Sequence, residues 1–162
     1  MSESPLDEST RALIVLAAAT AQGEQSEIRD AANEAVAAGV SPAWGDELIL
    51  QSVLIVGWPR ALMAAGQWRA AIGQPAVDGE SDLSYTEHYE WTRRGEETCS
   101  TIYGDNYARL RDNVYQLHPA LDAWMLTEAY GRTLSRPGLD LVRRELCVIA
   151  QTAVLNTPRQ LH

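Results

Sequence analysis

The sequence predicts an all-α fold, and two observations carry this prediction. Apolar residues recur at helical spacing between glycine and proline signals that start or stop helices. No alternating apolar and polar pattern of useful length indicates a strand. Hydrophobic residues make up 46% of the 162 residues, which is enough for a sizeable core. The expected architecture is a helical bundle.

Four helices are expected at the beginning of the chain, and they cover residues 6–23, 26–40, 41–57 and 58–73. The first opens with acids suited to a helix N-terminus, and the second is rich in alanine. The third starts with a Ser-Pro pair and is apolar on nearly every side, so we expect it to be buried. Pro59 starts the fourth helix and Gly73 ends it.

A stretch of proline, glycine and acid at residues 74–84 indicates a linker. Further helices are expected over residues 85–104, 105–117 and 118–134, and His118 followed by Pro119 is typical of a helix start. The turn 135–140, SRPGLD, precedes a last helix over residues 141–156. The second half of the chain is therefore also helical.

Charge and composition exclude several classes of function. The net charge of -9 argues against a nucleic-acid partner. All 13 basic residues are arginine, so chemistry that needs a lysine amine, such as a Schiff base or a P-loop, is excluded. No run of about 18 apolar residues and no signal peptide occurs, so we expect a cytoplasmic protein without a membrane span.

Cysteine and histidine are sparse and do not form a metal-binding pattern. Cys99 and Cys147 lie far apart and outside any CxxC motif, and Cys147 falls in an apolar run. The three histidines have no ligand spacing such as HxxxH. We therefore expect no metal, no cofactor and no dependence of activity on a thiol.

One helix opening occurs twice. Under a shift of 133 positions, six residues of the first helix meet identical residues of the last: Leu6, Asp7, Arg11, Leu13, Val15 and Ala17 meet Leu139, Asp140, Arg144, Leu146, Val148 and Ala150. A single recurring helix opening is not a solenoid period. The two copies indicate a duplicated structural unit.

At these residues the chain resembles the carboxymuconolactone decarboxylase family, within the wider group of alkylhydroperoxidase-D-like proteins. The GVSP turn, the apolar helix after it and the GWP motif resemble the C-terminal half of that family. The SRPGLD turn and its surroundings resemble the N-terminal half. The resemblance implies three segments. Residues 5–73 form a unit like the C-terminal half of the family, and residues 74–92 form a linker and lead-in. Residues 93–162 form a unit like the N-terminal half, and this unit is cut short.

The resemblance implies an enzyme that decarboxylates a small carboxylated lactone in aromatic catabolism, without a cofactor. Glu128, Glu145 and His162 are the residues expected to act in catalysis, and Arg136 and Arg144 those expected to bind the substrate. Four of them have a plainer interpretation: a structural ion pair for Glu145 and for Arg144, an exposed helix acid for Glu128, and an anchor of the turn for Arg136.

The peroxidase branch of the family uses a glutamate, a CxxC and a histidine. In the second copy Glu145 occupies the glutamate position, but Thr157 and Gln160 stand where the cysteines would be. In the first copy the four positions are Ala12, Glu24, Glu27 and Ala31. The alternatives to a decarboxylase are therefore a peroxiredoxin-type member without its thiols, or a non-catalytic member of the family.

The resemblance also implies a homo-oligomer. The apolar residues Leu146, Ile149, Val154 and Leu155 need a partner surface, and we expect the 93–162 region of one chain to pack on the 5–72 region of another. Trp58 and Trp68 are expected in the core or in subunit contacts rather than against a substrate.

Overall fold

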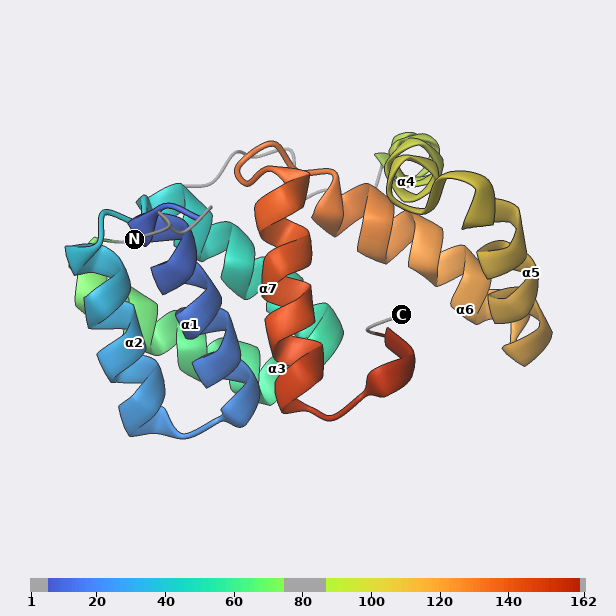
Figure 1. Ribbon diagram of the computed structural model, residues 1–162. Coiled ribbons are helices and arrows are strands. Elements are labelled where there is room, and N and C mark those ends of the chain that lie inside the picture. Colours follow the sequence, from blue (N-terminus) through green and yellow to red (C-terminus); the bar gives the residue numbers. More distant parts are fainter. Residues whose placement is uncertain (1–5, 75–86, 161–162) are drawn as a thin grey trace. The chain divides into compact units, whose positions relative to one another are not determined.

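The computed structural model describes residues 6–74 and 87–160, and within these ranges the chain forms helices and no strand. The prediction of an all-α fold is confirmed (Figure 1). The helices are α1 (Glu8–Gln22), α2 (Gln25–Ala37), α3 (Pro42–Ile72), α4 (His88–Tyr103), α5 (Tyr107–Leu117), α6 (Pro119–Trp124) and α7 (Leu141–Val154). Short 3₁₀ turns, η3 (Gly104–Asn106) and η5 (Pro158–Gln160), and a π-helical segment, η4 (Met125–Leu134), join or extend them.

The chain divides into two compact units. The first consists of Met1–Ala76 and Gly138–His162, and the second of Val77–Pro137. These limits differ from the expected ranges 5–73 and 93–162, because α7 packs on α1 and α3 and so belongs to the first unit. Helix α4 begins at His88, inside the range 74–92 that was expected to hold the linker and the lead-in.

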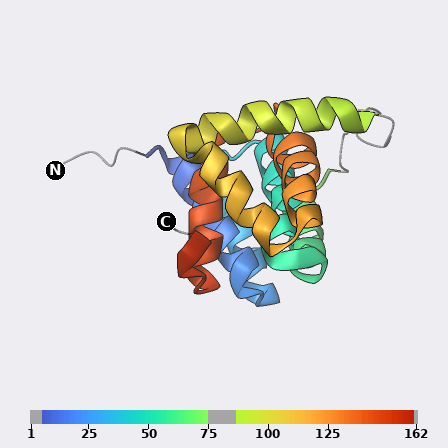
Figure 2. The same cartoon turned by 90° about the vertical axis from the view of Figure 1, so that its right-hand side faces the viewer.

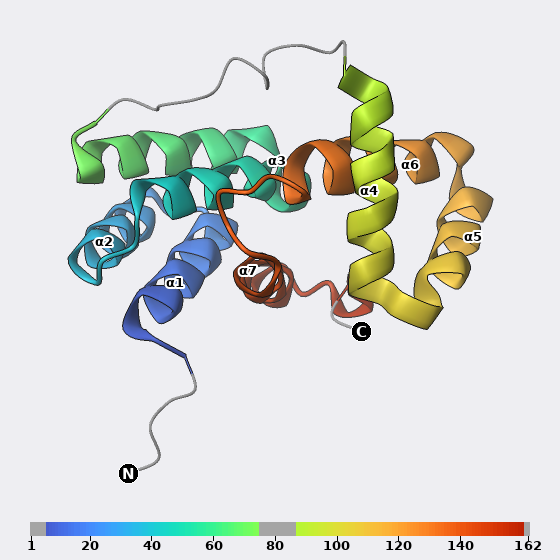
Figure 3. The same cartoon turned by 90° about the horizontal axis from the view of Figure 1, so that it is seen from above.

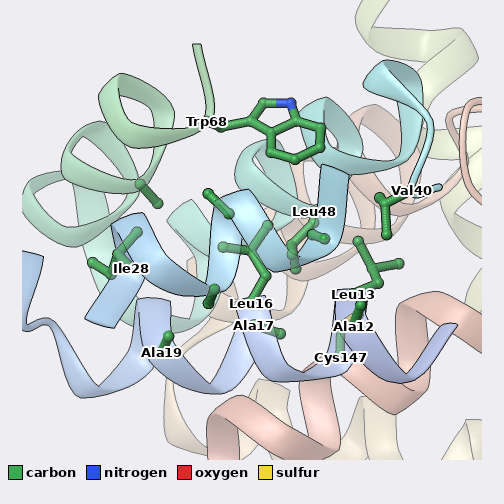
Figure 4. Packing of buried hydrophobic residues seen from close by; sticks show 14 of the residues in the cluster. Ala12, Leu13, Leu16, Ala17, Ala19, Ile28, Val40, Leu48, Trp68 and Cys147 are labelled. Carbon is green, nitrogen blue, oxygen red and sulfur yellow. The ribbon is translucent and has the colours of Figure 1, made fainter. Parts of the chain in front are cut away.

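The core of the first unit lies between α1, α2 and α3, with α7 against α1. Small and branched apolar side chains of α1, such as Leu13 and Leu16, gather with Leu48 and Trp68 of α3 in one buried cluster (Figure 4). Trp68 is fully buried, as expected for a core residue, whereas Trp58 is exposed. Figures 1 and 3 both show α7 beside α1.

Helix α3 is folded back on itself at Gly57. This residue has φ 76° and ψ 168°, a left-handed conformation that glycine adopts without strain. The indole of Trp68 donates a hydrogen bond of 3.0 Å to the carboxylate of Asp46, 22 residues earlier. In a straight helix 22 residues would separate these groups by about 33 Å. Two helices over 41–57 and 58–73 were predicted, and this break confirms them.

The break in α3 also bears on whether this apolar helix is long enough to span a membrane. By length and composition alone, α3 meets the requirements for a membrane-spanning helix. The break at Gly57 leaves two pieces, each shorter than the about 20 residues that a span needs. The first piece was expected to be buried, and this holds for one side of it only: Leu48 is buried, whereas Leu50 and Leu54 are exposed.

The second unit is built around the crossing of α4 with η4, which Figures 2 and 3 show from two directions. The helices approach so closely that a Cβ built on Gly131 would overlap the carbonyl oxygen of Trp91, and a Cβ on Gly95 would overlap that of Leu126. Arg111 and Asp122 form a bidentate ion pair between α5 and α6. The unit therefore has its own packing, independent of the first unit's core.

Candidate functional site

The two copies of the helix opening have the same cap. In α1 the carboxylate of Asp7 accepts a hydrogen bond of 2.7 Å from the backbone N–H of Thr10. In α7 the carboxylate of Asp140 accepts one of 3.1 Å from the backbone N–H of Arg143. Each aspartate is therefore the N-cap of its helix and satisfies a backbone donor that would otherwise lack a partner.

The arginine of each copy also makes an equivalent contact. Arg11 donates a hydrogen bond of 2.6 Å to the carbonyl of Leu6, and Arg144 donates one of 3.0 Å to the carbonyl of Leu139. Both arginines reach back five residues to the chain just before the cap. The duplication seen in the sequence is thus a duplication of local structure.

The two copies meet at equivalent positions. The Nε of Arg143 donates a hydrogen bond of 2.9 Å to the hydroxyl of Thr10, and these residues are 133 positions apart, which is the shift between the copies. Arg143 also binds both cap carboxylates, at 2.7 Å from Asp140 and 3.0 Å from Asp7. The N-terminal ends of α1 and α7 therefore lie side by side and are joined at equivalent positions of the two copies.

Arg144 lies at the centre of a buried polar network. Its side chain is fully buried, and its two terminal nitrogens donate to Glu47, at 2.8 Å, and to Gln51, at 3.1 Å. Gln51 in turn donates from its amide to the backbone carbonyl of Arg144, at 3.2 Å. Gly138 has no room for a side chain because Glu47 lies against it. The network therefore ties α3 to α7 and to the turn before it.

This geometry corrects the expectation that Arg144 binds the substrate. All three guanidinium nitrogens of Arg144 already donate to protein oxygens, from Glu47, Gln51 and Leu139. The guanidinium is also closed off from solvent. A substrate carboxylate would have to displace a buried ion pair, which is costly. Arg144 therefore acts in the packing of α7 on α3.

Two further buried polar residues extend the network along α7. The amide of Gln151 donates a hydrogen bond of 2.7 Å to the hydroxyl of Ser52, which donates to the carbonyl of Leu48. The side-chain oxygen of Gln151 has no hydrogen-bond partner among the described residues. Sequence reasoning missed this buried network. A signal was present in the apolar run ELILQS, where an acid, Glu47, and an amide, Gln51, stand four positions apart.

Glu145 follows Arg144 on α7 and has a different environment. Burial raises the pKa of its carboxyl above the usual range. Its equivalent in the first copy is Ala12, which is buried in the core. The second copy thus carries an acid that holds its proton more tightly than usual, at a position where the first copy has a methyl group.

Glu128 and Arg136 lie in the second unit. Glu128, in η4, forms an ion pair of 3.1 Å with Arg132, and its side chain is 41% exposed. Arg136 is half-buried in the turn that follows, where its backbone N–H bonds to Thr133. The five residues expected to form the site therefore do not share one unit: Glu145 and Arg144 belong to the first, and His162 lies outside the described residues.

Comparison with known families identifies the part of the chain that carries α1, α2 and most of α3. The model described as "Carboxymuconolactone decarboxylase family" matches residues 1–70. Residues 1–70 belong to the carboxymuconolactone decarboxylase family. No curated protein and no solved structure matches the chain.

The family match covers the first copy of the helix opening and the helices that follow it. In this carboxymuconolactone decarboxylase domain Ala12 and Ala31, two positions that carry catalytic groups in the peroxidase branch, are buried core residues. The first copy therefore supplies packing at these positions. The resemblance of residues 93–162 to the family stays a prediction.

The two thiols of the chain are unsuited to peroxidase chemistry. Cys99 and Cys147 are both free and buried. Burial raises the pKa of Cys99 to about 11 and that of Cys147 to about 12, so neither forms a thiolate readily. Thr157, at one of the motif positions, uses its hydroxyl to bind the carbonyl of Thr152. Among the described residues, no group of histidine, cysteine, aspartate or glutamate side chains is arranged so that it could hold a metal ion.

Proposed function

We propose that the protein is a decarboxylase of the carboxymuconolactone decarboxylase type, which removes carbon dioxide from a small carboxylated lactone of aromatic catabolism. The family domain at residues 1–70 supports the reaction class. The absence of lysine from the sequence favours a reaction that needs no Schiff base. The cytoplasm is the expected location for such a reaction.

The chemistry requires one proton donor. The bond between the lactone carbon and its carboxylate breaks, carbon dioxide leaves, and the electron pair moves into the lactone carbonyl as an enolate. The carbon is then protonated, and the enolate collapses back to the lactone. A carboxyl whose pKa is raised by burial holds its proton to a higher pH and is a suitable acid for this step.

Glu145 is the residue that we assign to this step, and its raised pKa is the observation that carries the proposal. After it gives its proton to carbon, Glu145 recovers one from water. Glu128 is a weaker candidate because its carboxylate is held by Arg132. Arg144 is withdrawn from substrate binding, and the role expected for Arg136, which belongs to the other unit, stays a prediction from the sequence.

The test is a measurement of carbon dioxide release from carboxymuconolactone by the purified protein. Glu145→Gln keeps the shape of the side chain and removes the proton, so turnover should fall by about 10²–10⁴-fold. Glu34→Gln, on the exposed side of α2, is the matched control and should behave like the parent. Equal turnover by Glu145→Gln and the parent would remove Glu145 from the mechanism.

A second candidate function is that of a non-catalytic family member. It is favoured by the buried network around Arg144, in which every guanidinium nitrogen serves the packing of helices. A folded parent protein that releases no carbon dioxide from any carboxylated lactone would support this alternative. The peroxidase alternative is disfavoured by the high pKa values of both thiols.

A further inference from the structure

Helices α4 and α5 of the second unit line an open cavity of about 630 Å³. The turn η3 joins these two helices, which are labelled in Figure 3. The cavity is lined by four side chains of α4 and two of α5: Arg93, Glu96, Glu97, Ser100, Tyr107 and Arg111. Sites for small molecules typically have volumes of about 300–1,000 Å³. None of the residues assigned to decarboxylation is among those that line this cavity.

The α4 side of the cavity is a face that the packing of the helix leaves free. Trp91, Gly95 and Cys99 are the buried residues of α4, and the first two lie where α4 crosses η4. The four lining residues of α4 follow at helical spacing on the other side of the helix. These polar side chains therefore take no part in the crossing of α4 with η4.

The two guanidinium groups of the cavity are held in place by acids. Arg111 donates to both carboxylate oxygens of Asp122 and, at 2.9 Å, to the hydroxyl of Tyr107. Arg93 donates twice to Glu90 and once to another glutamate of α4. A guanidinium has five N–H groups, and each of these two uses three of them in bonds between described residues. The remaining N–H groups can bind a ligand carboxylate, which is the preferred partner of a fixed guanidinium.

Carboxylate oxygens also remain available in the cavity. Glu96 is exposed and has no ion pair among the described residues, and Glu97 binds Arg93 through Oε2 alone. With the acids that hold the arginines included, the cavity has more carboxylates than guanidiniums: Glu90, Glu96, Glu97 and Asp122 against Arg93 and Arg111. A simple anion is therefore disfavoured, and a ligand that brings a cationic group together with its carboxylate is favoured.

An aromatic ring completes the lining. Tyr107 is half-buried, and the guanidinium of Arg111 lies 5.7 Å from the centre of its ring. A tyrosine ring beside fixed charges provides an apolar surface against which a second ring can pack. A ligand with an ammonium group, a carboxylate and an aromatic side chain therefore matches the three parts of the lining.

We propose that the cavity between α4 and α5 binds an aromatic α-amino acid in its zwitterionic form. The ammonium group binds Glu96 and the free oxygen of Glu97. The carboxylate binds the remaining N–H groups of Arg93 and Arg111, and the aromatic side chain packs against Tyr107. Such a ligand is neutral overall, so it binds without adding to the protein's net charge of -9.

The test measures binding to the full-length chain by isothermal titration calorimetry with three related probes. L-phenylalanine carries both charged groups, phenethylamine lacks the carboxylate, and hydrocinnamate lacks the ammonium group. L-phenylalanine should bind saturably. Each of the other two should bind about 10-fold more weakly or less, because a hydrogen-bonded charge pair is lost.

Two variants locate the binding in this cavity. Glu96→Gln keeps the shape of an exposed side chain and removes its charge, so it should weaken the binding of L-phenylalanine by about 10-fold and leave that of hydrocinnamate unchanged. Ser100→Phe fills the cavity and should abolish the binding of L-phenylalanine. Asp112→Asn removes a charge from an exposed position of α5 outside the lining, and it is the control that should bind like the parent. Circular dichroism verifies that each variant remains helical.

Four results would overturn the proposal. The first is a parent that does not bind L-phenylalanine. The second is equal binding of phenethylamine, which would indicate a site for simple cations, and the third is equal binding of hydrocinnamate, which would indicate a site for simple anions. The fourth is binding that survives Glu96→Gln and Ser100→Phe, which would place the ligand elsewhere. None of these measurements depends on the release of carbon dioxide, so this proposal and the proposed function can fail separately.

Discussion

Arg11 and Arg144 occupy the same position in the two copies of the helix opening, yet one is exposed and the other is buried. Both donate to the leucine carbonyl that precedes the cap. The difference arises from α3, whose Glu47 and Gln51 cover Arg144. The local motif could be predicted from the sequence, whereas the burial could not, because it depends on a helix about 95 residues away in the chain.

The first prediction compares these two arginines. Arg144→Met removes one partner of a buried ion pair and leaves Glu47 charged in the interior, so the free energy of unfolding should fall by about 3–5 kcal/mol. Arg11→Met, at the equivalent exposed position, should change it by no more than about 0.5 kcal/mol. Urea denaturation of both variants measures the difference. Similar small losses for both would contradict the buried network.

The second prediction concerns the proton on Glu145. Because burial raises its pKa in the folded state, the folded protein binds this proton more tightly than the unfolded chain does. Its contribution to stability is complete below the pKa of the unfolded chain, about 4.3, and is lost as the pH rises through the folded pKa. Glu145→Gln should therefore gain stability relative to the parent between acidic and neutral pH.

Denaturation curves of the parent and Glu145→Gln at several pH values test this sign. Glu34→Gln, at an exposed position of α2, makes the same change of side chain and is the control. A stability difference between Glu145→Gln and the parent that does not change with pH would mean that the environment of Glu145 does not favour its protonated form.

At the scale of elements, α3 shows what a sequence pattern can and cannot reveal. Pro59 and the glycine before it predict a helix break near residue 57, and the structure has one. The direction of the chain after the break was not predictable, because it depends on contacts between distant residues such as Trp68 and Asp46. For the same reason the apolar run before the break, expected to be buried, keeps Leu50 and Leu54 exposed.

The third prediction tests the helix crossing in the second unit. A Cβ at Gly131 would overlap backbone atoms of α4, so Gly131→Ala should lower the free energy of unfolding by about 1–3 kcal/mol or more. Gly66, in α3, has no heavy atom within reach of an added Cβ. Gly66→Ala should therefore raise the free energy of unfolding by about 0.4–1 kcal/mol. Thermal denaturation of both variants gives the two signs, and equal effects would refute the close approach of α4 and η4.

For the whole molecule, the sequence predicted the family and the helical content better than the arrangement of the parts. The resemblance at residues 5–72 is confirmed by the family match at residues 1–70. The domain limits expected from the sequence stay a prediction. The packing of α7 on α1 through Arg143 and Thr10 was not foreseen, because no local pattern shows this contact. Of the expected site residues, Arg144 has all its donors engaged by protein oxygens, and the catalytic role of Glu145 stays a proposal that its burial supports.

The central claim, that Glu145 donates the proton in a decarboxylation, is tested most directly by the pH dependence of kcat with carboxymuconolactone. A proton donor must be protonated in the enzyme–substrate complex, so kcat of the parent should fall as the pH rises through the raised pKa of Glu145. The residual turnover of Glu145→Gln should lack this fall, because glutamine has no proton to lose. A parent whose kcat does not fall with rising pH, or a Glu145→Gln variant with the same fall, would contradict the claim.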